Sequence, residues 1–234
     1  MDDLSRKLVG KFIVIDGPDG AGKTTQLKKL REYLGQLGLG VQVATDPGTT
    51  SIGQKIRAML LDRDNGEIGS MCETLLFMAS RAQLMYEVIS PALTAGVAVL
   101  CDRFVSATLA YQGASGVSRD SIMTLAEIAI AGRWPHLTII LDLPAEVGMR
   151  RIGVLRNRLK GECEDGHQQL PLFGDRMEIR ASVYHRKVRR IFRDLHRFYP
   201  SKVRNVSAAG TEDEVFERIL LAISEELASE PREA

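Results

Sequence analysis

The sequence predicts an α/β fold, in which a parallel sheet of about five strands is covered by helices on both faces. Short apolar segments alternate with segments whose apolar residues recur at helical spacing, which is typical of such sheets. The first apolar segment, residues 12–16, runs into a glycine-rich turn and then a helix over 23–38. Polar residues also follow several predicted strands, at the edge where parallel sheets bind ligands.

The composition is that of one folded domain over residues 1–234, and it sets limits on the partners. A net charge of +1 gives no electrostatic reason to expect nucleic-acid binding. No apolar run approaches the ~18 residues of a membrane span, and no apolar segment follows the first charges as in a signal peptide. Three scattered cysteines, Cys72, Cys101 and Cys163, form neither a metal-binding spacing nor a disulfide framework. We therefore expect a cytoplasmic protein with reduced thiols and no membrane or nucleic-acid partner.

The glycine-rich turn, residues 17–24, has the GxxxxGK[ST] spacing of a phosphate-binding P-loop and the strand and helix that this loop requires. Glycines allow backbone N–H groups to converge on phosphate oxygens, and the helix N-terminus adds positive potential. Lys23 is predicted to reach the β- and γ-phosphates, and Thr24 to offer its hydroxyl to Mg²⁺. The predicted ATP-binding residues are Gly17, Pro18, Asp19, Gly20, Ala21, Gly22, Lys23, Thr24 and Thr25.

The remaining elements alternate in the same way. Further strands are predicted over 41–44, 97–100, 137–141 and 202–206. Helices are predicted over 52–60, 70–94, from the third strand through Tyr111, and over 118–131, 145–158 and 175–199, with a loop over 161–174. A C-terminal helix is predicted from the apolar residues Val215, Ile219, Leu220 and Ile223, with a frayed end after Ala228. In the helix over 70–94, Pro91 marks a kink or an earlier end. Its predicted core face is Leu75, Ala79, Ala82, Tyr86 and Ile89.

Asp102 and Arg103 directly follow the strand over 97–100. A guanidinium at this place presents a planar, permanently charged fork to a phosphate. An ion pair between Arg103 and Asp102 or another neighbour explains the same residues equally well.

Two further groups of residues share helix faces. Phe77 and Arg81 lie one turn apart, so a ring that stacks on a base could stand beside a hydrogen-bond donor. The alternative is that Phe77 belongs to the core and Arg81 is a solvated charge. Thr108, Tyr111 and Gln112 also share a face, and by themselves are as consistent with packing as with a ligand.

Several of these segments, in this order, resemble the thymidylate (dTMP) kinase family. The similar segments are residues 12–26, Asp46-Pro47-Gly48-Thr49-Thr50, residues 75–83, Asp102-Arg103-Phe104, Ala110-Tyr111-Gln112-Gly113, residues 137–142 and Asp175-Arg176-Met177-Glu178. The resemblance implies a P-loop kinase fold that transfers a phosphoryl group from ATP, with Mg²⁺, to dTMP to give dTDP. It also implies a homodimer, through helices near 52–60 and 70–94.

The resemblance assigns roles on the acceptor side. It implies that Phe77 stacks on thymine, that Arg81 hydrogen-bonds the base, that Arg103 holds the dTMP phosphate and that Tyr111 lies against the sugar. The other substrate-binding residues that it implies are Asp46, Pro47, Thr108, Gln112 and Glu178.

Asp19 and Glu178 are the two acidic residues to which the resemblance gives a role near the reacting groups. Asp19 would face the acceptor sugar and, through water, the metal, and Glu178 would approach the same region from the helix after the lid. Without the resemblance, Asp19 is a turn residue and Glu178 a charge on a helix surface.

Gly20 indicates which segment supplies the positively charged catalytic side chains. In one branch of the family an arginine follows the P-loop acid, whereas in the bacterial type a glycine stands there and the lid supplies the positive charge. Phosphoryl transfer needs that charge over the bridging and γ-oxygens. The lid over about 150–174 offers Arg151 first, and then Arg156 and Arg158, as catalytic residues, although most arginines on such a helix are solvated.

The chain also departs from the family pattern. Ala44-Thr45-Asp46-Pro47 replaces Thr-Arg-Glu-Pro, Leu84 stands where histidine is common, Ala107 takes the usual serine position, and residues 161–174 carry an acidic insert. These changes leave open a kinase for another deoxynucleoside monophosphate or a nucleoside. A nucleotide-dependent regulatory ATPase is a further alternative.

Overall fold

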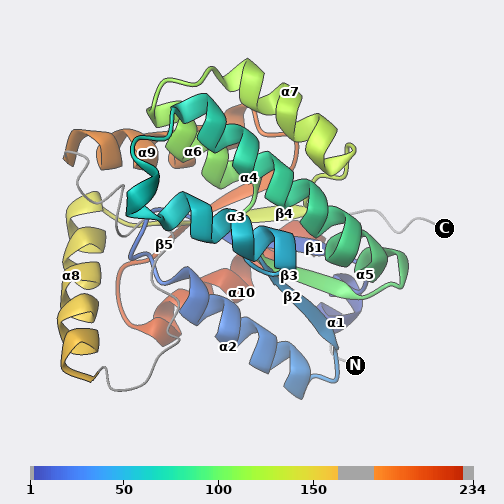
Figure 1. Cartoon of the computed structure of the whole chain (residues 1–234). Coiled ribbons are helices and arrows are strands. Elements are labelled where there is room, and N and C mark those ends of the chain that lie inside the picture. The colour runs from blue at the N-terminus through green and yellow to red at the C-terminus, as the bar shows by residue number, and fades with distance from the viewer. Residues whose placement is uncertain (1–2, 163–181, 229–234) are drawn as a thin grey trace.

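The computed structural model describes residues 3–162 and 182–228, and its centre is a sheet of five parallel strands in the order β2-β3-β1-β4-β5 (Figure 1). Every pairing is parallel. The strands are β1 (Phe12–Asp16), β2 (Val41–Thr45), β3 (Ala98–Asp102), β4 (Leu137–Asp142) and β5 (Lys202–Ser207). The predicted α/β fold with about five parallel strands is confirmed.

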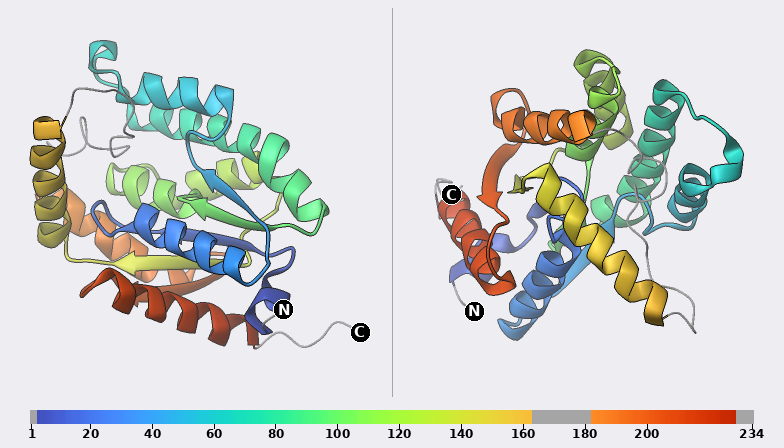
Figure 2. Two further views of the ribbon diagram at one scale, coloured as in Figure 1. Left: turned by 90° about the horizontal axis from the view of Figure 1, so that it is seen from below. Right: turned by 90° about the vertical axis from the view of Figure 1, so that its left-hand side faces the viewer.

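Helices connect the strands and cover both faces of the sheet (Figure 2). They are α1 (Asp3–Leu8), α2 (Lys23–Gln36), α3 (Ser51–Leu61), α4 (Ser70–Leu84), α5 (Ser90–Thr94), α6 (Val105–Ala114), α7 (Arg119–Ile130), α8 (Ala145–Glu162), α9 (Ser182–Asp194) and α10 (Glu212–Ala228). Short helical turns occur at η1 (Arg63–Asn65), η2 (Met85–Ile89) and η3 (Leu195–Arg197). None of the described helices is long and apolar enough to cross a membrane.

The alternation of side chains along the central strand divides the interior into two cores. Phe12 and Val14 point into a core with residues of α4, α6 and α9, whereas Ile13 and Ile15 point into a core with residues of α2 and α10. All five residues of β1 are fully buried, as expected for a central parallel strand. Because both faces are covered, ligands can reach this sheet only at its ends.

The segment over 70–94 follows one helical path, but its predicted core face is wrong. Leu75 is 48% exposed and Tyr86 is 78% exposed, whereas Phe77 and Leu84 are buried. Apolar residues occupy both sides of α4, so periodicity alone does not identify the inward side. The π-helical turn of η2 then adds a residue to the helix repeat and returns Ile89 to the core.

The region around the predicted lid also differs in its bounds. The basic helix runs to Glu162 in place of residue 158, so the predicted loop over 161–174 begins inside α8. The rest of that loop, from residue 163, lies outside the described residues, as does the first part of the predicted helix over 175–199. The structure describes that helix from Ser182 as α9. Helix α1 was not predicted, and it precedes the first strand.

Candidate active site

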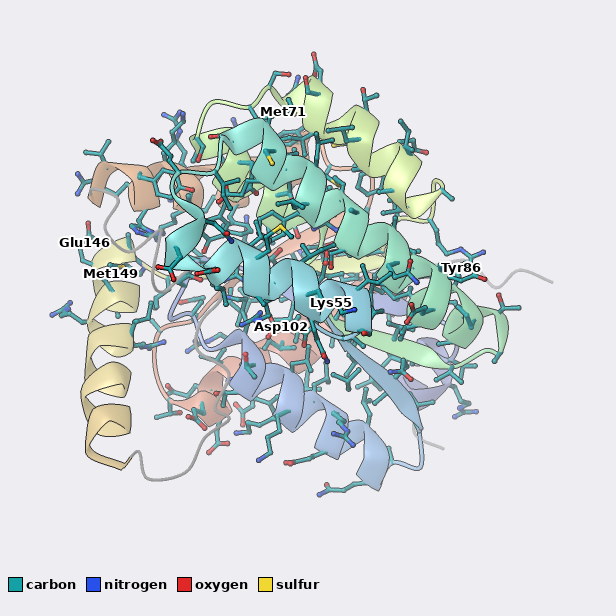
Figure 3. All side chains as sticks on the ribbon, viewed as in Figure 1. Lys55, Met71, Tyr86, Asp102, Glu146 and Met149 are labelled. Carbon is teal, nitrogen blue, oxygen red and sulfur yellow. The ribbon has the colours of Figure 1, made fainter. Side chains whose placement is uncertain are left out.

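The three polar clusters that follow predicted strands meet at the carboxyl end of the sheet. The P-loop follows β1, Asp46 follows β2, and Arg103 follows β3, and these three strands are neighbours. Figure 3 labels Asp102 at the end of β3, among side chains of the surrounding helices. Helix α8 lies beyond this end of the sheet, at the left in Figure 1 and in the left panel of Figure 2. The fold therefore brings predicted donor and acceptor residues to one place.

Lys23 is folded back over the P-loop. Its Nζ donates hydrogen bonds of 3.0 Å to the carbonyl oxygens of Gly17 and Pro18, and its side chain is buried. Burial lowers the pKa of Lys23 to about 8, and the positive charge of Arg103 makes a smaller contribution in the same direction. Gly22 precedes α2 with a φ of 89°, a conformation that favours glycine. The ammonium is therefore held at the mouth of the loop, where phosphate oxygens would replace the two carbonyl contacts.

Thr24 and Asp102 together form a set of hard oxygen ligands. The hydroxyl of Thr24 donates a hydrogen bond of 2.8 Å to Oδ2 of Asp102. The other carboxylate oxygen, Oδ1, is buried and has no hydrogen-bond partner among the described residues. A hydroxyl beside a carboxylate with an unused oxygen fits Mg²⁺, which prefers oxygen ligands. The metal was predicted at Thr24 and, through water, at Asp19, and Asp102 was not among the predicted metal ligands.

Arg103 connects the P-loop with the acceptor side. Its Nη2 forms an ion pair with Oδ1 of Asp19, its Nη1 lies 3.8 Å from Oδ1 of Asp16, and its guanidinium lies 5.1 Å from the ring centre of Tyr111. The ion pair that was one of the two interpretations of Arg103 is therefore present, with Asp19 and Asp16 as partners. Oδ2 of Asp19 is buried and has no hydrogen-bond partner among the described residues, so the pair keeps an unused acceptor at the site.

Asp16, the last residue of β1, links the P-loop to α6 and lies close to Arg103, and it was not predicted as a site residue. It accepts hydrogen bonds from the backbone N–H of Gly17, at 2.8 Å, and from the hydroxyl of Ser106, at 2.6 Å. Burial raises the pKa of Asp16, although the charges of Arg103 and Lys23 oppose that shift. Its place as the last residue of a buried strand, directly before the P-loop, was the available signal.

Arg81 is buried, and its hydrogen bonds are made within the protein. It is 1% exposed, and its Nε donates to Oδ2 of Asp46 at 2.6 Å. Its Nη2 donates to the carbonyl oxygen of Phe104 at 3.0 Å and to the hydroxyl of Thr108 at 3.1 Å. The interpretation of Arg81 as a solvated charge is wrong. Asp46 precedes Pro47 through a cis peptide bond, and burial raises the pKa of Asp46 against the opposing charge of Arg81.

Together with Arg81, residues Phe77, Tyr111 and Gln112 of α4 and α6 form a buried surface, here called the wall. Phe77 is 5% exposed, so it is a core residue as well as a candidate base platform. Tyr111 is fully buried, with its ring against Phe192 and Arg103. Gln112 donates from Nε2 to Oε2 of Glu73 at 3.0 Å. Glu73 was missed by the sequence analysis, although an acid four residues before Phe77, on the same helix face, was a usable signal.

Helix α8 contacts the P-loop through two glycines. A Cβ on Gly20 would lie 2.4 Å from the carbonyl oxygen of Gly148, and a Cβ on Gly148 would lie 2.3 Å from the carbonyl oxygen of Asp19. The helix backbone therefore covers the place where a side chain at position 20 would project. Figure 3 shows the labelled side chains of Glu146 and Met149 along this helix.

Arg151 lies one turn farther along α8. It donates to the carbonyl oxygen of Gly20 at 3.4 Å and to that of Ala208 at 3.3 Å. The structure thus brings Arg151 to the P-loop. The side chains of Arg156 and Arg158, also on α8, and the whole of Glu178 lie outside the described residues.

The fold and the site together define a P-loop phosphotransferase with a separate acceptor wall. The family model described as thymidylate kinase matches residues 15–219. The chain is 42% identical to a thymidylate kinase of Syntrophotalea carbinolica, over 92% of this chain and 96% of the relative. It is 40% identical to one of Pelobacter propionicus, over 92% and 94%, and 35% identical to one of Clostridium novyi, over 90% and 96%. The chain belongs to the thymidylate kinase family.

Proposed function

We propose that this protein transfers the γ-phosphoryl group of ATP to dTMP, giving dTDP and ADP, within a single P-loop domain. The observation that carries the proposal is the contact between Arg103 and Asp19. It joins a nucleoside triphosphate loop directly to a buried wall that presents an aromatic ring and hydrogen-bonding side chains. A switch or regulatory ATPase needs a P-loop but has no use for such a wall.

On the donor side, backbone N–H groups within residues 17–25, all but that of Pro18, which has none, bind the phosphates of ATP, and Lys23 supplies a positive charge. Mg²⁺ would be held by the hydroxyl of Thr24 and the carboxylate of Asp102, with Asp19 able to contact it through water. When bound, the ion neutralises charge on the β- and γ-phosphates. The unused buried oxygens of Asp19 and Asp102 support this assignment.

On the acceptor side, Arg103 holds the dTMP phosphate. Its guanidinium can give up the ion pair with Asp19 and bind phosphate oxygens in its place. Phe77 stacks on the base and Arg81 donates to it, while Tyr111 lies against the sugar. Asp46 and Pro47 shape the loop next to Arg81, and Thr108 and Gln112 border the base. The phosphate of dTMP is already largely anionic at neutral pH, so the attack needs no general base.

The lid supplies the remaining charge. Arg151 at the P-loop, with Arg156 and Arg158 farther along α8, stabilises the charge that develops on the transferred group. Glu178 approaches the acceptor from the segment after the lid. The lid also excludes water from the site and so limits hydrolysis of ATP.

We further propose a cytoplasmic homodimer formed through α3 and α4. The supporting observation is a set of large apolar side chains that are about half exposed or more on these helices and on η2: Ile52, Met59, Met71, Leu75 and Tyr86. Met71 and Tyr86 stand at opposite ends of this surface in Figure 3. An apolar surface of this kind is typical of a face that packs against another subunit.

A panel of acceptors tests the proposed function. We expect acceptor-dependent formation of ADP, with dTMP preferred over dUMP, dCMP and thymidine in kcat/KM. A wide preference for dCMP or for a nucleoside would overturn the acceptor assignment. ATP hydrolysis that no acceptor accelerates would favour a regulatory ATPase.

A further inference from the structure

Helices α4 and α6 are joined by two polar contacts, one on each side of Phe77. Glu73 and Arg81 lie one turn before and about one turn after Phe77 on the same face of α4. Glu73 accepts a hydrogen bond from Gln112, and Arg81 donates one to Thr108. Gln112 and Thr108 are themselves one turn apart on α6. The aromatic ring that would carry the base is therefore bordered by a side-chain hydrogen bond at either end.

The contact between Glu73 and Gln112 fixes the orientation of an amide. Glu73 is 6% exposed and Gln112 is 1% exposed, so water does not compete freely for either group. A carboxylate only accepts hydrogen bonds, so the atom of Gln112 that faces Glu73 must be the amide nitrogen. The carbonyl oxygen Oε1 is then the atom that Gln112 presents away from Glu73. A glutamine without such a partner could turn over and present either a donor or an acceptor.

We propose that Glu73 is a positioning residue that makes the base site selective for pyrimidines with a hydrogen on N3. By holding the amide nitrogen of Gln112, Glu73 leaves an acceptor beside the base that stacks on Phe77. Thymine and uracil offer N3–H to that acceptor, whereas the N3 of cytosine is itself an acceptor. This inference rests on the proposed function and adds the residue that sets the direction of one base contact.

The chemistry predicts a clear difference between acceptors. Cytosine would place two acceptors opposite each other in a buried site, and an unsatisfied buried polar group costs more than a missing contact gains. Sites that hydrogen-bond a substrate group reject analogues that lack it for the same reason. Uracil lacks the methyl group of thymine but keeps N3–H, so dUMP is expected to be a better acceptor than dCMP in the wild-type protein.

The test is Glu73→Gln, which keeps the size of the side chain. A glutamine at position 73 can accept from Nε2 of Gln112 or donate to its Oε1, so the amide is no longer held in one orientation. We expect the ratio of kcat/KM for dTMP to that for dCMP to fall about tenfold, which corresponds to one hydrogen bond. The loss is expected mainly in KM for dTMP, while KM for ATP and the melting temperature stay close to wild type.

The matched control is Glu87→Gln. Glu87 pairs with Gln83 through the same two residue types, but on the exposed side of the same helical stretch. This variant should leave the ratio unchanged. Gln112→Leu removes the acceptor itself, and a double variant with Glu73→Gln should be no less selective than Gln112→Leu alone, because Glu73 acts through Gln112.

Three outcomes overturn the inference: an unchanged ratio in a folded Glu73→Gln protein, an equal loss for dTMP and dCMP, and additive effects in the double variant. If Glu73→Gln does not fold, Glu73→Asp keeps the acceptor at a greater distance, and a ratio equal to wild type would then contradict the proposal. Failure of the proposed function is a separate result, because a wild-type protein that does not phosphorylate dTMP would reveal it before any variant is made.

Discussion

The acceptor wall and the lid helix differ in how they are held. In the wall, formed by α4 and α6, Arg81 and Gln112 are buried and hydrogen-bond to other side chains of the protein. Helix α8 reaches the P-loop mainly through the contact of Gly148 and through the exposed Arg151. A site whose side chains are already positioned loses little entropy when it binds, which favours selectivity. A helix that touches the loop at its backbone and through an exposed arginine can instead bring charge to the reacting group.

Arg103→Ala is expected to give the largest effect, because Arg103 connects the wall with the P-loop that α8 contacts. We expect kcat/KM for dTMP to fall about a hundredfold to a thousandfold, as when a charged group that stabilises the transition state is removed. The affinity for ATP should stay nearly unchanged, since Lys23 and the loop backbone remain. Steady-state kinetics and equilibrium binding of an ATP analogue measure the two effects separately.

The control for this experiment is Arg31→Ala, which removes an exposed arginine of α2. It should retain wild-type kinetics. If the kinetics with dTMP were also unchanged in Arg103→Ala, Arg103 would have no place in the site, and the connection between the two regions would be structural only.

Gly148→Ala tests whether the contact between α8 and the P-loop matters. The added Cβ would lie 2.3 Å from the carbonyl oxygen of Asp19, so α8 and the P-loop must move apart. Because Arg151 contacts the loop from the same helix, we expect kcat to fall at least about tenfold, as small displacements of catalytic groups do. The affinity for dTMP, which depends on the wall, should change much less.

Gly153→Ala is the matched variant on the same helix. A Cβ there meets nothing within 4 Å, so the substitution gains the same helix propensity without the clash. We expect wild-type kcat and a stability increase of about 0.5–1 kcal/mol, seen in thermal unfolding. Equal kinetics for the two alanine variants would mean that the glycine contact does not position the lid.

The P-loop and the residues that support the site differ in how far the sequence predicts them. The P-loop and the strand ends follow from local patterns, since glycine spacing and an apolar run before it are both visible in the chain. Three residues in or beneath the candidate site were not predicted as site residues: Asp16, Glu73 and Asp102. Their roles depend on partners far away in sequence, such as Ser106 for Asp16 and Gln112 for Glu73. No periodicity shows such a pairing.

Burial was also hard to predict where both sides of a helix are apolar. The inward side of α4 carries Arg81, whereas Leu75 of α4 and Tyr86 of η2 face outward, which reverses the usual rule. Arg81 can be buried because Asp46, the carbonyl of Phe104 and Thr108 accept its hydrogen bonds. Two segments, the loop after β2 and the start of α6, supply these groups, so only the folded structure reveals the compensation.

The smallest expected effect concerns the proton of Lys23. Its pKa of about 8 lies below its ordinary value of 10.5. Between these two values the folded protein has released a proton that the unfolded chain retains, so this group adds stability as pH rises through that window. Phosphate oxygens near Lys23 favour the charged form and raise its pKa again. Binding of an ATP analogue with Mg²⁺ at pH 8 should therefore take up as much as about half a proton.

Calorimetry in two buffers of different ionisation enthalpy measures this proton uptake. At pH 6.5 Lys23 is already charged, so almost no uptake is expected there. Binding of dTMP at pH 8 is the internal control, because the buried wall does not contain Lys23 and should give a smaller uptake. Equal uptake at the two pH values would mean that the ammonium is fully charged in the free loop and that burial does not lower its pKa. Equal uptake with dTMP would mean that the acceptor also changes the environment of Lys23, and that the donor and acceptor regions respond to ligands together.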